Sequence, residues 1–514
     1  MLACYTDRLS LSPGEAASLH ASSTPASACS IEVARIGAKR EVVHTAGHIM
    51  VGAYPTPANS DALGCHWPAI TEIRPGTDWP SGYYDIVLSN SAGETAHHFV
   101  CVKPAASARP APSALILATN TYHAYNWWGG ANAYCDVTSL MSRAKALPQA
   151  MAGAIGVLST QRPFVPLIVA APPDTPRLVN LRPRGFLKRP WAGSREWARQ
   201  HRPSPYDRSA GFVNKWEHAF VAWAETHGIA LDIFTDIDLD SDPDLLAPYK
   251  VAIVAGHSEY WSGRQRAQLD AFVDGGGNLA IFSGNTCFWK VRWEADGKSL
   301  VCHKWRGFEA EPAAGRNATH LWSHPAFAQP EASLTGLSFL FGGYHRLGMC
   351  AARGTGGYTV YHNRHWMLEG TDLFYGDVIA PDLPLLGYEN DGCRFEFDSD
   401  GLPAAIPSLG VPKNLEIVAI APCAFGEEAD GGYPPLIPPE KLDVCAGIVY
   451  GDTSARSQAR LLRGHAVLAS FVRGKGEVFN CGTTEWAHAL SAANPFVERI
   501  TTNVLRRFGA FPGN

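Results

Sequence analysis

Residues 114–283 alternate between continuous apolar runs and amphipathic segments, and this order constrains the fold more than any other feature. Strands covered on both faces read as such uninterrupted runs. They comprise residues 114–118, 167–170, 231–234, 251–255 and 279–283. Between them, apolar residues at helical spacing predict helices over 214–227 and after Ser262, the second ending at the glycines 275–277. Strands that alternate with helices indicate an α/β fold with an open parallel sheet.

The first hundred residues have a different sequence pattern. Residues 83–88 and 97–102 are short β-prone runs separated by a turn-like segment, which predicts a small β-sandwich. A Pro/Ala-rich stretch at 106–113 then reads as a linker. We therefore expect three parts, namely a β domain at 1–105, this linker, and an α/β catalytic domain at 114–514 with long inserted loops at about 300–475 and a closing helix over 495–508.

Composition excludes several classes of protein. The 514 residues carry 43 Lys and Arg against 48 Asp and Glu, so no basic field favours nucleic acid or an anionic membrane. No run of 18 apolar residues predicts a membrane span. The 12 cysteines contain no C-x-x-C pair, and the first residues lack a signal-peptide pattern, so we expect a cytoplasmic protein with reduced thiols.

Polar and aromatic residues follow three of the predicted strands directly. These clusters lie at 119–130, 256–261 and 284–289. Ligands of open α/β sheets bind beside the carboxyl ends of the strands, where such clusters converge. We therefore expect the site there.

The 256–261 cluster leaves two kinds of chemistry open. In an extended run His257 and Glu259 share a face and Ser258 points away, and no G-x-S-x-G motif is present, so a serine hydrolase is disfavoured. Cys287 with His257 as its base is one alternative. A metal held by His257, Glu259 and a phenolate is the other, and the available tyrosines are Tyr122, Tyr125 and Tyr134.

The acidic run at 236–244 resembles a calcium loop only superficially. It lacks the glycine and the terminal glutamate of an EF-hand loop. We expect a solvated turn at these residues.

Several motifs together resemble the large (β) subunit of N,N-dimethylformamidase. They lie in the same order over about 114–510 and comprise residues 121–130, 256–262, 284–289, 365–366, 387–392, 474–480 and 485–486. The resemblance implies an Ig-like β-sandwich followed by an α/β domain akin to glutamine amidotransferases. It also implies a partner, either a small subunit or a second copy of the chain.

The resemblance further implies a mononuclear iron held by two tyrosines and one glutamate. Glu259 and Tyr125 match two of these positions. The position of the second tyrosine reads Phe164, which cannot bind a metal. Either Tyr134, Tyr122 or His123 supplies the remaining ligand, or the protein holds no iron.

By the same resemblance, the activity is hydrolysis of the C–N bond of a small, formamide-like N-substituted amide. His257 and Asn285 would contact the substrate carbonyl, Glu389 would serve as general base, and Lys304 would assist. The expected pocket residues are Tyr122, His123, Asn126, Trp127, Phe164, Tyr260, Trp261 and Cys287. The alternatives are a metal-free amidase that uses Cys287 and His257, and a non-catalytic homologue that binds a ligand or serves in assembly.

Overall fold

The structure is a computed structural model of the chain. It describes residues 1–134, 156–170, 210–213, 216–344, 357–383, 385–387, 389–425 and 439–511. No helix in these segments is both long and apolar enough to cross a membrane.

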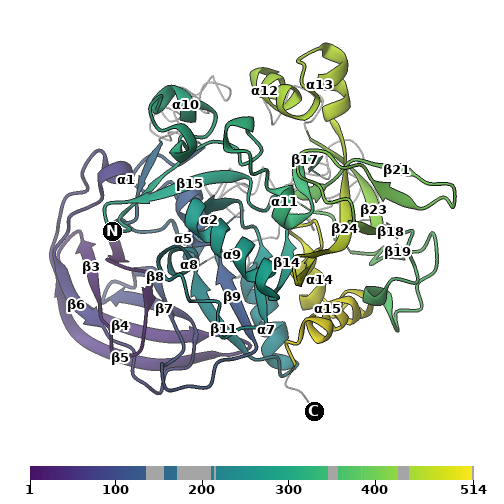
Figure 1. The fold of residues 1–514 in the computed structure, drawn as a ribbon. Coiled ribbons are helices and arrows are strands. Elements are labelled where there is room, and N and C mark those ends of the chain that lie inside the picture. The colour runs from purple at the N-terminus through teal and green to yellow at the C-terminus, as the bar shows by residue number, and fades with distance from the viewer. Residues whose placement is uncertain are drawn as a thin grey trace, which may run out of the picture.

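The N-terminal part consists of two facing β-sheets, drawn in purple in Figure 1. One sheet has the strand order β1 (Leu2–Thr6), β3 (Ala17–Ser23), β6 (Ala69–Ile73). The other has the order β2 (Ser10–Leu11), β8 (Thr95–Val102), β7 (Gly82–Asn90), β4 (Ser27–Ile36), β5 (Arg40–Val51). Leu19 of the first sheet and Val33 and Ile86 of the second share one core. The strands predicted at 83–88 and 97–102 are confirmed as β7 and β8.

A large mixed sheet forms the centre of the molecule. Five neighbouring strands run parallel, in the order β11 (Leu231–Thr235), β9 (Ser113–Leu117), β12 (Val251–Gly256), β14 (Asn278–Ser283), β25 (Gly476–Asn480). Four of them are the predicted apolar runs. Their continuous burial follows from helices on both sides of the sheet, so the expected open parallel α/β arrangement is confirmed for this part.

The two faces of this sheet bury different sets of side chains. On β9, Leu115 and Leu117 lie in the core that contains α7 (Trp216–Thr226), α14 (Trp486–Ser491) and α15 (Pro495–Phe508). Ala114 and Ile116 point the other way, toward α8 (Asp236–Ser241) and α9 (Gly263–Gly275). Alternate residues of each strand thus serve opposite layers. Ser262 caps α9, as predicted, by accepting a hydrogen bond from the Gln265 amide at 3.1 Å.

Beyond β25 the sheet continues through antiparallel strands. β24 (Arg463–Arg473) pairs with β25 and with β23 (Glu416–Ala424), and β18 (Tyr358–Val360) and β19 (Val378–Ile379) follow. A hairpin of β21 (Phe395–Phe397) and β22 (Pro403–Ala405) joins at β23. Figure 1 shows this extension in green and yellow. The region predicted to contain loops and hairpins therefore also supplies strands of the central sheet.

Two local predictions are wrong. The apolar run at 167–170 predicts a strand, but Pro166–Val169 form a short helix, α5, because Pro166 provides a preset first helical residue. The acidic run is not a solvated turn, because it begins with helix α8, which carries a capping box at Thr235 and Asp238. Asp236 within it is buried and accepts hydrogen bonds from the Asn120 amide and the Gln265 side chain.

Candidate active site

The segments that follow β9, β12, β14 and β25 meet at one edge of the sheet. Helix α2 (Thr119–Tyr125) follows β9, and His257 and Glu259 come directly after β12. Asn285 follows β14. The side chains of Tyr125, His257, Glu259 and Asn285 are almost completely buried. The predicted convergence at the carboxyl ends of the strands is confirmed.

Glu259 lies at the centre of a cluster of phenols. The Tyr134 hydroxyl lies 2.7 Å from both carboxylate oxygens, and the Tyr125 hydroxyl lies 3.1 Å from Oε2. The Tyr260 hydroxyl donates to that of Tyr134 at 2.6 Å. The chain thus brings the phenol oxygens of Tyr125 and Tyr134 within hydrogen-bond distance of one carboxylate.

A second group of polar side chains adjoins Glu259. The Nε2 atom of His257 lies 2.6 Å from Glu389 Oε2 and 3.4 Å from Glu259 Oε2. The Asn285 amide donates to the same Glu389 oxygen at 3.1 Å. The Asn285 Oδ1 atom is buried and accepts no hydrogen bond from the described residues. It is therefore an acceptor that a bound substrate or water can use.

The backbone around Glu389 explains how a remote segment reaches this edge of the sheet. The amide of Thr484, after β25, donates to the Glu389 carbonyl at 3.1 Å. Gly284 lies so close that a Cβ atom there would be 2.3 Å from the same carbonyl oxygen. Any larger residue at position 284 would therefore displace the segment that carries Glu389.

Burial shifts the pKa values of the ionisable groups in the site. It raises the pKa of Glu259, although His257 and Lys304 act in the opposite direction. Lys304 is buried, with its Nζ atom 3.0 Å from the centre of the Tyr134 ring. Desolvation lowers the pKa of Lys304 to about 8, against the pull of Glu259. A cation over a phenol ring beside a carboxylate favours the ionised forms of both oxygen groups.

The structure separates the candidates for the second tyrosine. Tyr134 contacts Glu259, whereas the Tyr122 hydroxyl donates to Glu217 of α7 at 2.7 Å. The His123 ring packs against Phe164 at 5.0 Å, and burial lowers the pKa of His123 to about 3. Phe164 itself packs among the rings of His98 and Phe99. Of these residues, only Tyr134 is a direct neighbour of Glu259.

Arg162 is a residue of this region that the sequence pattern does not single out. It is fully buried, and its guanidinium donates to the backbone carbonyls of Asn126, Trp128 and Ala131. The Asn126 side chain in turn binds the Pro163 carbonyl and the Val165 amide. These contacts give Asn126 and Arg162 a role in fixing the turn that leads to Tyr134.

Three expected pocket residues lie in packed surroundings. The Cys287 sulfur accepts from the Arg266 guanidinium of α9 at 3.6 Å, and burial raises the pKa of its thiol. Trp261 is fully buried and donates to the Ser258 hydroxyl at 2.8 Å. Trp127 is partly buried and packs against the core shared with α7. The Ser258 contact confirms that this residue points away from His257 and Glu259.

Two overlapping sets of atoms could hold a metal. One is the oxygen set of Tyr125, Tyr134 and Glu259. The other comprises His257, Glu259 and Glu389, whose ligand atoms lie within 4.8 Å of one another. Glu259 belongs to both. The first set is all oxygen, a donor type that suits a hard cation, and phenolate ligands suit the trivalent state of iron.

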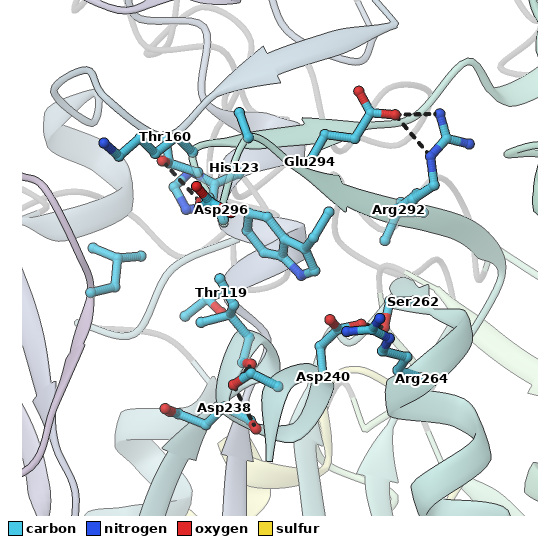
Figure 2. A pocket seen from close by; sticks show the side chains of 18 of the residues that line it. Thr119, His123, Thr160, Asp238, Asp240, Ser262, Arg264, Arg292, Glu294 and Asp296 are labelled. Atoms are coloured by element: carbon cyan, nitrogen blue, oxygen red, sulfur yellow. Dashed lines mark hydrogen bonds and ion pairs between the residues drawn. The ribbon is translucent and has the colours of Figure 1, made fainter. Parts of the chain in front are cut away.

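A large cavity with many charged lining residues adjoins α2 on another side. It has a volume of about 1100 Å³ and lies between the N-terminal sheets, α8, the start of α9 and the hairpin of β15 (Trp289–Glu294) and β16 (Ser299–Val301) (Figure 2). His123 lines it, but Tyr125, Glu259 and Glu389 do not. Figure 2 shows Arg292 paired with Glu294, and Arg292 also binds Glu311 at 2.6 Å. This cavity is therefore distinct from the buried cluster.

Comparison with known proteins identifies a family. The model of the family described as "N,N-dimethylformamidase beta subunit-like, C-terminal" matches residues 30–499, which is nearly the whole chain. No curated protein gives a match. The matched range contains every side chain of the buried cluster. The chain belongs to the N,N-dimethylformamidase beta subunit-like family.

Proposed function

We propose that the protein hydrolyses the C–N bond of a small N-substituted amide. The observation that carries this proposal is the cluster in which Glu259 contacts two phenols on one side and the His257–Glu389 pair on the other. A cation site and a proton-accepting carboxylate then lie beside each other, both in contact with His257. Family membership supports an amide substrate.

The residues fit an iron ion. Tyr125, Tyr134 and Glu259 would hold it through three oxygen atoms, and loss of the two phenol protons would leave negative charge that a trivalent cation balances. When bound there, iron supplies Lewis acidity toward a carbonyl oxygen or a water. Lys304, above the Tyr134 ring, favours the phenolate form of Tyr134.

The remaining side chains transfer the proton and orient the carboxylate that carries it. Glu389 takes the proton of the attacking water and passes it to the leaving amine. His257 and Asn285 both contact Glu389 Oε2 and so orient this carboxylate. In this proposal His257 and the second N–H of the Asn285 side-chain amide also stabilise charge that develops on the substrate carbonyl oxygen, for which one donor contributes about 3 kcal/mol.

Burial restricts the substrate to a small molecule with an apolar body. His257 is 1 % exposed, and its ring lies between those of Tyr125 and Trp216, at 5.6 and 6.0 Å. The walls beside the reacting groups are therefore aromatic. A formamide with small N-alkyl groups matches such walls better than a charged amide does.

Metal content is the first test. Protein purified without chelators is expected to contain about one iron per chain and to show a visible tyrosinate-to-iron charge-transfer band. Tyr134→Phe is expected to remove the band and most of the iron. Tyr122→Phe is the matched control, because the Tyr122 hydroxyl binds Glu217 instead. Equal iron and absorption in both variants would contradict the ligand set.

Turnover tests the role of Glu389. Glu389→Gln keeps the shape of the side chain but removes the proton acceptor, so amine release from N,N-dimethylformamide is expected to fall by about 10²–10⁴-fold with iron retained. Glu416→Gln is the control, since Glu416 is exposed and pairs with His365. Unchanged turnover of Glu389→Gln would remove this residue from the mechanism.

The two alternatives are tested by the same preparations. A metal-free amidase would lose activity on alkylation of Cys287 and keep it with chelators, although this thiol is buried and faces Arg266. A non-catalytic homologue would hold no iron and release no amine. Phe164→Tyr would then be expected to restore neither property, because Phe164 packs among His98, Phe99 and His123.

We further infer the finer features of the fold and of the assembly. The two facing N-terminal sheets support an Ig-like domain, and the parallel sheet supports an amidotransferase-like domain, divided at 106–113. The family description supports a partner subunit or a second copy of the chain, which the molar mass in solution would reveal. The described cysteines are buried and unpaired, which supports a reducing, cytoplasmic compartment.

A further inference from the structure

A second hollow lies in the antiparallel part of the central sheet. It has a volume of about 680 Å³, within the range of small-molecule pockets. Strands β23 and β24, the hairpin strand β21 and the helices α12 (Pro439–Tyr450) and α13 (Ala455–Leu461) contribute to it. We call it the β21 groove. Its aromatic lining comprises Phe341, Tyr361, Phe395, Phe397 and Tyr450.

Positive charge accompanies these rings. Arg394, Arg460 and Arg463 line the β21 groove. A described carboxylate that interacts with one of them is that of Asp452, outside the lining, whose pKa is lowered by hydrogen bonds and in part by the charge of Arg460. The Arg460 guanidinium lies 4.4 Å from the centre of the Tyr450 ring, and that of Arg394 lies 5.9 Å from the same ring. The described lining contains no Asp or Glu.

This local charge opposes that of the whole molecule. The chain has a net charge of −5, so its average surface repels anions. The β21 groove is an exception, because three arginines line it and two of them, Arg394 and Arg460, lie over the Tyr450 ring. Guanidinium groups bind carboxylates through paired donors and stack on aromatic planes, and both properties are available here.

We propose that the β21 groove binds a small organic anion with an aromatic or apolar body, such as an aromatic carboxylate. The acid group lies against Arg394, Arg460 and Arg463, and the body packs against the aromatic lining. Phe397 is 53 % exposed, and its ring lies 5.5 Å from that of Tyr361, so part of this lining faces water before a ligand covers it. None of these residues belongs to the Glu259 cluster, and the proposal stands independently of the proposed amidase function.

A pair of dyes tests the proposal directly. 8-Anilinonaphthalene-1-sulfonate carries an aromatic body and one negative charge, whereas N-phenyl-1-naphthylamine has the same body without the charge. Fluorescence titration of the full-length protein is expected to show saturable binding of the sulfonate at one site per chain, tighter than that of the uncharged amine. Binding of the sulfonate should weaken as salt is added, because the cationic side chains are partly exposed to solvent.

Variants locate the binding site. Arg394→Gln with Arg460→Gln is expected to weaken sulfonate binding by about tenfold or more and to leave binding of the uncharged amine unchanged. Arg364→Gln removes the same charge from an exposed residue outside the β21 groove and should change neither. Arg463→Gln alone, at an exposed position, provides the test if the double variant does not fold.

Each outcome of these titrations either supports or overturns the proposed anion site. Loss of sulfonate binding in the groove variants alone supports the proposal. Equal sulfonate affinity in wild type and groove variants would place the dye elsewhere and overturn it. Equal loss of both dyes would show that the substitutions disturb the groove itself rather than remove a charge that the anion needs, which would overturn the anion selectivity.

Discussion

Asp391 holds the turn that presents Asn285. Its two carboxylate oxygens accept the backbone amides of Asn285 and Thr286, at 2.9 and 3.1 Å. Asn285 has a φ of +50°, a conformation that L-residues adopt at some energetic cost. Burial raises the pKa of Asp391 to about 7, and the two amide donors oppose this rise. The carboxylate thereby keeps the Asn285 side chain within reach of Glu389.

Replacement of Asp391 tests this positioning role. Asp391→Asn keeps one acceptor and places a donor against the second backbone amide, so the turn is expected to shift. We expect kcat for amide hydrolysis to fall about ten- to a hundredfold while iron content stays unchanged. The control is Asp398→Asn, since exposed Asp398 also accepts two backbone amides, those of Asp400 and Leu402. Wild-type kcat in Asp391→Asn would contradict this role.

At the scale of elements, the turn after α2 brings the second phenol to Glu259. The amide of Ala133 donates to the Ala124 carbonyl at 3.0 Å, and Asn132 donates to that of Tyr125 at 2.9 Å. The chain therefore folds back along its own helix. Arg162 stabilises this turn through its bonds to three backbone carbonyls.

Arg162→Lys is expected to loosen the turn. A lysine carries the charge but cannot reach three carbonyls at once, so buried acceptors lose partners at a cost of about 2 kcal/mol. We expect a lower midpoint of thermal unfolding and a weaker charge-transfer band. Arg74→Lys, at an exposed ion pair with Glu72, should alter neither. A normal charge-transfer band in an Arg162→Lys protein with a lowered unfolding midpoint would show that metal binding does not depend on this turn.

The same elements show how far sequence reasoning extends. The sequence predicts His257, Glu259 and Asn285 as neighbours because each follows a buried strand, and the apolar runs of the sequence predict where these strands lie. It offers Tyr134 only as one of three substitutes for Phe164. The position of Tyr134 depends on the Arg162 contacts, which join residues about 30 positions apart and leave no periodic signal. The prediction for Asp236 is wrong for a similar reason, because its partners lie on other elements.

At the scale of the whole molecule, the five-stranded N-terminal sheet packs directly on the central sheet. Arg35 of β4 pairs with Glu225 of α7 at 2.6 Å, and the Cys101 thiol of β8 lies 3.4 Å from the Ile233 carbonyl of β11. His98 of β8 is fully buried in this region and lies 5.3 Å from the Phe164 ring. Desolvation lowers the pKa of His98 to about 3.

This burial predicts how stability depends on pH. Between pH 6.5 and pH 3 the unfolded chain binds a proton at His98 that the folded chain does not, so stability falls as the pH falls. One such histidine costs about 1.4 kcal/mol per pH unit within that window. His98→Phe is therefore expected to reduce, by up to one proton, the slope with which the thermal midpoint falls between pH 6.5 and pH 4. The slope does not vanish, because the pKa values of His123 and His320 are also lowered to about 3 and that of His365 to about 4. His44→Phe, at an exposed position of β5, should leave the slope unchanged, and identical slopes in both variants would show that protonation of His98 does not oppose folding.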